Sequence, residues 1–135
     1  MKKLIVLSVV LIALLLGCSS EPEKTFQNPA EVIKALDKHS MTDCSELVFW
    51  RIGANGGIDC QYDDGNDSDG IEIYTFDGNA KDKCQDNSFC KALLEENLSD
   101  MESLGQPDRL NFYGNVMLYW VTDPDEDAIL DDLKD

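Results

Sequence analysis

The chain has 135 residues, and its 27 acidic side chains outnumber its 11 basic ones, which gives a formal net charge of −16 at pH 7. Such a negative surface repels nucleic acid and anionic lipid headgroups, which argues against both as partners of the folded part. A cationic protein or peptide, or a metal ion, is electrostatically favoured. Solubility in a salty habitat is the simpler explanation of the same charge.

The first 17 residues have the profile of a secretory signal peptide. Lys2 and Lys3 form a short positive region, and Leu4–Leu16 contain Ser8 as their one polar residue. A membrane-spanning helix needs roughly 20 apolar residues, so this run is too short to remain as a span. We therefore expect cleavage after residue 17, which removes two positive charges and leaves a net charge of −18.

The apolar run ends in Leu15-Leu16-Gly17-Cys18, which resembles the lipobox of bacterial lipoproteins. In that family the cysteine after a small residue is acylated and becomes the first residue of the mature protein. The resemblance implies that Cys18 is lipidated and that its acyl chains hold the protein on the extracytoplasmic side of the cell membrane. In a Gram-negative host this can be the outer membrane. At about 0.8 kcal/mol for each buried CH2 group, two chains anchor a protein stably.

A tether and one domain are expected after the anchor. Residues 18–27 are polar and predict a lipidated flexible tether, and residues 28–135 suffice for a single extracytoplasmic domain. Its first element is a helix over residues 28–38. Asn28 is its N-cap, Pro29 occupies its first turn and Glu31 completes a capping box.

Three strands follow this helix in the predicted order of elements. Ser45–Ile52 is rich in β-branched and aromatic residues, and the turn at residues 54–57 leads into a second strand, Ile58–Tyr62. Gly70–Phe76 alternates apolar with polar side chains and predicts the third strand.

The second half of the domain predicts a long helix, a hairpin and a short helix. Apolar residues recur at helical spacing over Asp86–Leu104, and Gly105 ends that helix. Arg109–Tyr113 and Val116–Thr122 flank a two-residue turn, and a last short helix follows Asp123-Pro124. The order α-β-β-β-α-β-β-α predicts an α+β fold with an antiparallel sheet of about five strands and helices packed on one face.

Four cysteines remain beyond Cys18, namely Cys44, Cys60, Cys84 and Cys90. An even number in an exported chain indicates two disulfides. Of the three possible connectivities we favour Cys44 with Cys60 and Cys84 with Cys90, because each pair closes a short loop. A zinc site is the alternative, but the chain has no Cys-x-x-Cys pair and its only histidine is His39.

The order of these elements resembles that of small uncharacterised lipoproteins and secreted proteins of actinobacterial type. The matching pieces span most of residues 28–135 and are Cys44, Cys60, Ile73-Tyr74-Thr75-Phe76, Tyr113-Gly114-Asn115 and Tyr119-Trp120-Val121. The resemblance supports a disulfide between Cys44 and Cys60, whereas Cys84 and Cys90 depart from the pattern. It implies no activity, because none is known for such proteins.

The acidic loop over residues 63–70 is the candidate metal site. Asp63, Asp67 and Asp69 alternate as the oxygen ligands of a calcium loop do, which suggests weak calcium binding. The full EF-hand pattern fails, because Gly65 and Phe76 stand where its first aspartate and bidentate glutamate belong. A solvated loop is the simpler interpretation, and no other cofactor is expected.

The sequence favours a binding module over an enzyme. It has no Gly-x-Ser-x-Gly motif, His39 is expected at a solvated helix end, and no carboxylate pair is distinctive in so acidic a chain. Trp50 and Trp120, on hairpin strands, are candidate binding residues, although packing in the sheet is the simpler role for both. We predict an interaction module for a protein or peptide at the cell surface, using an exposed sheet face or the acidic loop. A small envelope hydrolase is the alternative.

Overall fold

A computed structural model describes residues 23–36, 41–63, 68–121 and 126–134 of the chain. The expected signal peptide, the expected lipidation site Cys18 and the lone histidine, His39, lie outside these residues. Within them, no helix combines the length and the apolar character that crossing a membrane requires.

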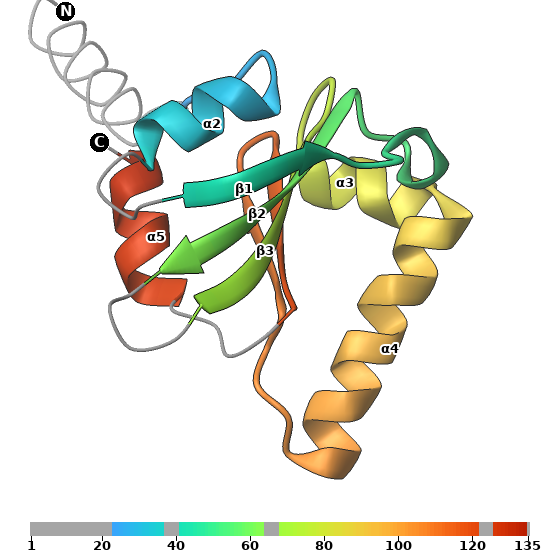
Figure 1. The fold of residues 1–135 in the computed structure, drawn as a ribbon. Helices are drawn as coiled ribbons and strands as arrows, with labels where there is room; N and C mark the ends of the chain where they lie inside the picture. The colour runs from blue at the N-terminus through green and yellow to red at the C-terminus, as the bar shows by residue number, and fades with distance from the viewer. Residues whose placement is uncertain (1–22, 37–40, 64–67, 122–125, 135) are drawn as a thin grey trace, which may run out of the picture.

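The described residues form one five-stranded antiparallel sheet with helices around it (Figure 1). The elements in chain order are α2 (Pro29–Ala35), β1 (Met41–Glu46), the 3-10 turn η3 (Trp50–Ile52), β2 (Gly56–Asp63), β3 (Ser68–Thr75), α3 (Ala80–Asp86), α4 (Ser88–Leu104), β4 (Leu110–Tyr113), β5 (Val116–Trp120) and α5 (Glu126–Lys134). The strands lie in the order β1-β2-β3-β5-β4, with every neighbouring pair antiparallel. The predicted α+β class and five-stranded sheet are confirmed.

The helices cover both faces of the sheet, which differs from the single covered face that we expected. Ile71 and Ile73 of β3 join a first core with side chains of α2 and α5. Tyr74, on the opposite face of the same strand, joins a second core with α3 and the start of α4. Figure 1 shows α2 and α5 on one side of the sheet and α3 and α4 on the other. The second cover is needed because β3 and β5 carry apolar side chains on both faces.

The prediction of a strand over Ser45–Ile52 is wrong for most of these residues. β1 begins earlier, at Met41, and its pairing with β2 ends at Glu46 opposite Ile58. The chain then leaves the sheet, and η3 closes at Gly53, whose φ of 78° suits a residue without a side chain. Packing overrides the local preference for a strand here, because Ile52 is buried in the second core.

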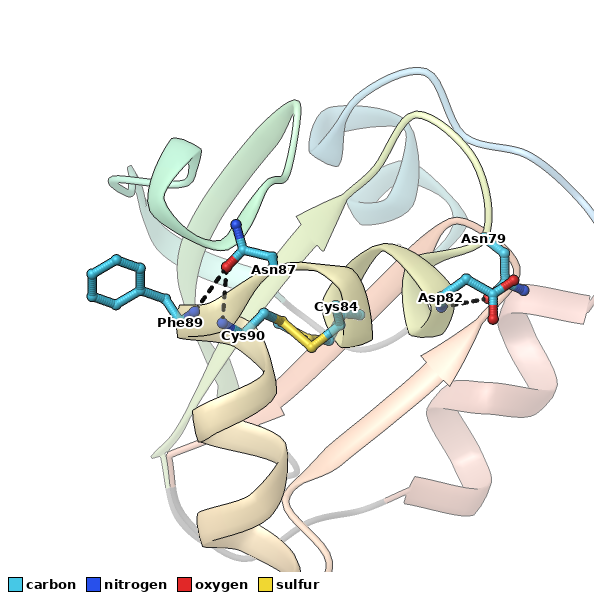
Figure 2. Close-up of a disulfide and its surroundings, with 7 residues drawn as sticks. Asn79, Asp82, Cys84, Asn87, Phe89 and Cys90 are labelled. Carbon is cyan, nitrogen blue, oxygen red and sulfur yellow. Dashed lines mark hydrogen bonds between the residues drawn. A yellow bond between two sulfur atoms is a disulfide. The ribbon is translucent and has the colours of Figure 1, made fainter.

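The predicted helix over Asp86–Leu104 is preceded by a separate helix that we did not predict. Asn79 caps α3, its side chain accepting a hydrogen bond from the Asp82 N–H at 3.1 Å. Asn87 has extended backbone and begins α4, accepting from the N–H groups of Phe89 (3.1 Å) and Cys90 (3.0 Å), as Figure 2 shows. Each asparagine satisfies helix N–H groups that have no partner within the helix.

A buried amide joins the N-terminal segment to the predicted β4–β5 hairpin, whose two-residue turn is Gly114-Asn115. The Asn115 side chain is 4% exposed, accepts a hydrogen bond from the Phe26 N–H at 2.9 Å, and donates to the carbonyls of Phe26 and Phe76. Phe26 itself is 3% exposed and belongs to the first core. The expected flexible tether therefore has a docked C-terminal end.

We predict that Asn115→Ala lowers the free energy of unfolding by about 1–3 kcal/mol, because it leaves buried backbone groups of Phe26 and Phe76 without partners. The midpoint of urea denaturation measures the change. Gln85→Ala removes an exposed amide from α3 and is the matched control, for which we expect almost no shift. Equal midpoints for Asn115→Ala and the unchanged protein would contradict the proposed clamp.

Candidate docking surface along helix α4

A disulfide fixes the first turn of α4 against the sheet. Cys84 of α3 and Cys90 of α4 are bonded, with 2.06 Å between their sulfurs, and both are fully buried (Figure 2). The Cys90 sulfur also lies 3.8 Å from the sulfur of Met117 on β5. The second disulfide joins Cys44 of the edge strand β1 to Cys60 of β2. The structure therefore has both of the disulfides that we favoured.

Beyond this first turn, α4 diverges from the sheet (Figure 1). Leu94 is half-buried against the second core, but most of the other apolar side chains of the helix face solvent. Their exposed fractions are 61% for Phe89, 39% for Leu93, 49% for Leu98 and 66% for Leu104. Several exposed apolar side chains on one helix make α4 a candidate protein interaction site.

Two hollows lie between α4 and the neighbouring strands, separated by a hydrogen-bonded strut. Asn97 donates to Asp108 at 2.9 Å and accepts from the Arg109 N–H at 3.0 Å, while Asp108 also accepts from the Leu110 N–H at 3.1 Å. The first hollow, of about 480 Å³, has Leu94, Leu98, Leu110, Phe112 and Leu130 in its lining, together with Lys81 and Asp108. The second, of about 300 Å³, has Leu93, Glu96, Asp100, Leu104, Arg109 and Tyr119 in its lining. We call the two hollows together the α4 groove.

The segment that contains most of α4 and the chain after it is acidic. Between Lys91 and Arg109 the sequence has five carboxylates and no basic residue; they are Glu95, Glu96, Asp100, Glu102 and Asp108. Glu95 lies 3.9 Å from Lys91, but both side chains are exposed, so this ion pair contributes little. The Arg109 guanidinium donates to the Val121 carbonyl at 3.1 Å.

The sheet adds two opposed carboxylates beside the groove. Asp59 of β2 lies directly opposite Glu72 of β3, and Glu72 lies opposite Tyr119, which lines the second hollow. Like charges in this position repel each other. The Tyr74 hydroxyl donates to Glu72 at 2.6 Å on the same face. The face of the sheet that adjoins α4 is thus aromatic and negative.

The two tryptophans that we singled out have opposite environments. Trp120 is fully buried, donates to Asn111 at 2.8 Å and makes an edge contact with Tyr62, with ring centroids 6.2 Å apart. It is therefore a core residue and is not accessible to a ligand. Trp50 is 68% exposed on η3, with the Arg51 guanidinium 5.5 Å from its ring centre. Because η3 packs against α4, Trp50 extends the exposed apolar surface beyond the start of the helix.

The candidate calcium ligands are only partly placed. Asp67 lies outside the described residues. Asp63 is the last residue of β2, and Asp69 of β3 pairs with Tyr62 of β2. In the described part of the chain no three acidic, histidine or cysteine residues are grouped so that they could hold a metal ion. Weak calcium binding stays a prediction.

Comparisons with protein-family models, with curated proteins and with solved structures found no match to this chain. The α4 groove was not among the sites predicted from the sequence. The available signal was the helical spacing of the leucines in α4, which we used only to predict the helix.

We predict that the stability of the fold declines in alkali through Tyr74. Burial raises the pKa of its phenol above the ordinary value, and the hydrogen bond to Glu72 and the negative charges of Glu72 and Asp59 raise it further. In the unfolded chain the phenol loses its proton above about pH 10, while in the folded protein it stays protonated, so the free energy of unfolding falls as pH rises past that value.

Denaturant titrations on both sides of this pH, followed for Tyr74→Phe and for Tyr113→Phe as the matched control, measure the effect. Tyr74→Phe should flatten the alkaline decline, and Tyr113→Phe should leave it in place. An unchanged slope in Tyr74→Phe would assign the decline to other groups.

Proposed function

We propose that this protein is a membrane-anchored extracytoplasmic lipoprotein whose domain is an interaction module at the cell surface. The α4 groove is its docking surface. The observation that carries this proposal is the exposure of four large apolar side chains on α4, a helix whose first turn is fixed by the Cys84–Cys90 disulfide. A rigid apolar surface loses little conformational entropy on binding, which favours its use as a docking site.

The alternative, an envelope hydrolase, has less support. It requires an acid and a base that meet in a cleft, and Asp108, which lines the first hollow, already accepts hydrogen bonds from Asn97 and Leu110. Asp59 and Glu72 are opposed in the sheet, but Glu72 accepts the hydrogen bond of the Tyr74 hydroxyl. The hydrogen bonds of Asp108 and of Glu72 are thus accounted for by the stability of the fold.

The proposed anchor gives the groove a direction. Seven residues separate Cys18 from Phe26, so the docked end of the segment lies at most about 28 Å from the lipidated cysteine. Phe26 is held at the β4–β5 turn, whereas the end of α4 leads into the start of β4, at the opposite end of that strand (Figure 1). The far end of α4 would therefore lie away from the membrane.

The anchor is tested by Cys18→Ser, which removes the proposed acylation site. We expect the variant to lose incorporation of a labelled fatty acid and to leave the membrane fraction, since no other lipid attachment is proposed. Cell fractionation and metabolic labelling measure these two changes, with Ser20→Ala as a control for a substitution in the same segment. Persistent fatty-acid labelling of Cys18→Ser would refute the lipobox assignment.

The docking surface is tested by placing a photo-cross-linking residue at position 98, in place of the half-exposed Leu98. Position 34 on α2, where Lys34 is exposed on the other side of the sheet, is the matched control. In intact cells we expect a discrete cross-linked protein from position 98 and none from position 34, as judged on denaturing gels. The same adducts from both positions, or none from position 98, would exclude α4 as the docking surface.

A further inference from the structure

We infer that the first hollow binds an extended, uncharged apolar segment of a partner protein, which pairs with the edge strand β4 as a further strand of the sheet. This inference rests on the proposed function and names the mode of binding and the partner's chemistry. It follows from the unpaired backbone groups of β4, from the course of the hollow around them and from the side chains on its two sides.

The outer backbone groups of β4 can be identified from its pairing with β5. The Trp120 N–H donates to the Arg109 carbonyl at 2.9 Å, so these two residues form a hydrogen-bonded pair. Hydrogen-bonded and non-hydrogen-bonded pairs alternate along an antiparallel ladder, and the register places Leu110 and Phe112 in pairs of the second kind. The N–H and C=O groups of Leu110 and Phe112 therefore point away from β5.

Three of these four backbone groups have no partner in the described part of the chain. The Leu110 N–H donates to the Asp108 carboxylate at 3.1 Å. No described strand pairs with the outer side of β4, and no hydrogen bond joins the Leu110 carbonyl or either backbone group of Phe112 to another described residue. Unpaired groups at the edge of a sheet are the template to which an extended peptide adds.

The first hollow passes around this edge of the sheet. Leu94 and Leu98 of α4 lie on one face of the sheet and Leu130 of α5 lies on the other, yet all three line the hollow (Figure 1). Because the sheet separates its two faces, a hollow that reaches both must pass around the edge strand. Three of the four residues of β4 are also in its lining. A strand added here directs alternate side chains toward α4 and toward α5, so both of its sides contact leucines.

The charges of the first hollow favour an uncharged segment. Lys81 and Asp108 are the two charged residues in its lining, and their charges have opposite signs. Asp108 already accepts hydrogen bonds from the Asn97 side chain and the Leu110 N–H. The ligand is therefore selected by its extended backbone and its apolar side chains, and not by its net charge.

The opposite edge of the sheet is less suited to an added strand. β1 has an irregular register between Thr42 and Ser45, where Asp43 has a positive φ of 49°. A bulge of this kind disrupts the row of backbone groups and protects an edge from pairing. The register of β4 with β5 has no such interruption.

A second copy of the chain and a lipid bilayer fit the first hollow poorly. The outer edge of β4 lies between side chains of α4 and α5, so the same edge of a second copy would bring its own two helices against them. Both copies also carry a net charge of −16. An acyl chain has no N–H and C=O groups to pair with those of Phe112. A single extended segment of another protein is the occupant that fits.

The test uses the full chain in zwitterionic nanodiscs and a labelled peptide of about eight residues, with blocked ends, in which leucine alternates with threonine. Two further peptides carry N-methyl groups, one on every leucine and the other on every threonine. Successive amides of a strand point to opposite edges, so one set of methyl groups faces β4 and the other faces solvent. Fluorescence anisotropy, corrected with empty nanodiscs, measures binding. We expect one methylated peptide to bind within about twofold of the unmodified peptide and the other at least about tenfold more weakly.

Two matched pairs of variants locate the site. Phe112→Pro removes the outward N–H without removing a hydrogen bond to β5, and Phe112→Val keeps that N–H. We expect Phe112→Pro to bind the unmodified peptide at least about tenfold more weakly than Phe112→Val does. Leu98→Ser alters the first hollow and Leu104→Ser alters the second. We expect Leu98→Ser to weaken binding about three- to tenfold and Leu104→Ser to leave it nearly unchanged.

Several results would overturn the inference. The same affinity for both methylated peptides, equal binding by Phe112→Pro and Phe112→Val, or no binding of the unmodified peptide would each do so. The methylated peptides decide the question on the unchanged protein, whether or not Phe112→Pro folds. A negative result, together with a specific cross-link from position 98, would leave the proposed docking surface in place and refute only the added strand. Loss of the cross-link as well would remove both proposals.

Discussion

The central strand β3 carries apolar side chains on both of its faces, and the rest of the fold depends on this property. Ile71 and Ile73 require one cover, which α2 and α5 supply, and Tyr74 on the opposite face requires another. The second cover is built from α3 and the beginning of α4, joined by the buried Cys84–Cys90 disulfide. The turns of α4 beyond that core cover little of the sheet (Figure 1). The exposed leucines of α4 are thus a consequence of how the two-sided sheet is covered.

Strands with a clear local signal were predicted well. β3 alternates Ile71 and Ile73 with Glu72 and Tyr74, and the turn at Gly114-Asn115 has the length and the positive φ at Gly114 that a tight hairpin requires. The segment Ser45–Ile52 has equally strand-like residues, yet Ile52 is buried in the second core from a 3-10 turn. Nothing local distinguishes these two cases, because the difference arises from which core the side chains reach. α3 was missed for the opposite reason, since its two buried residues, Ala80 and Cys84, are too few to show helical periodicity.

The candidate site shows the same limit of sequence reasoning. The leucines of α4 fall at helical spacing, which correctly predicts a helix with an apolar side. Spacing cannot tell whether that side is covered by the same chain or by another, because both give the same pattern. The tryptophans illustrate this as well. Trp120 alternates with Tyr119 along β5 and faces the first core, whereas Trp50 occupies a turn and faces solvent. Trp120 is buried because its face of β5 is covered, and Trp50 is exposed because its turn lies outside the sheet.

The proposed anchor and the charge of the domain act together on the position of the groove. An anionic bilayer repels a mature chain with a net charge of −18, but at physiological salt this repulsion decays over about 8 Å. The segment from Cys18 to Phe26 can extend about 28 Å, several times that distance. The domain can therefore stand beyond the range of the repulsion while the acyl chains remain in the bilayer. The Asn115 amide fixes the N-terminal segment at the β4–β5 turn, so in the proposed anchored state that end would face the bilayer. In the proposed anchored state, the docked segment and the repulsion together would keep the far end of α4 clear of the bilayer.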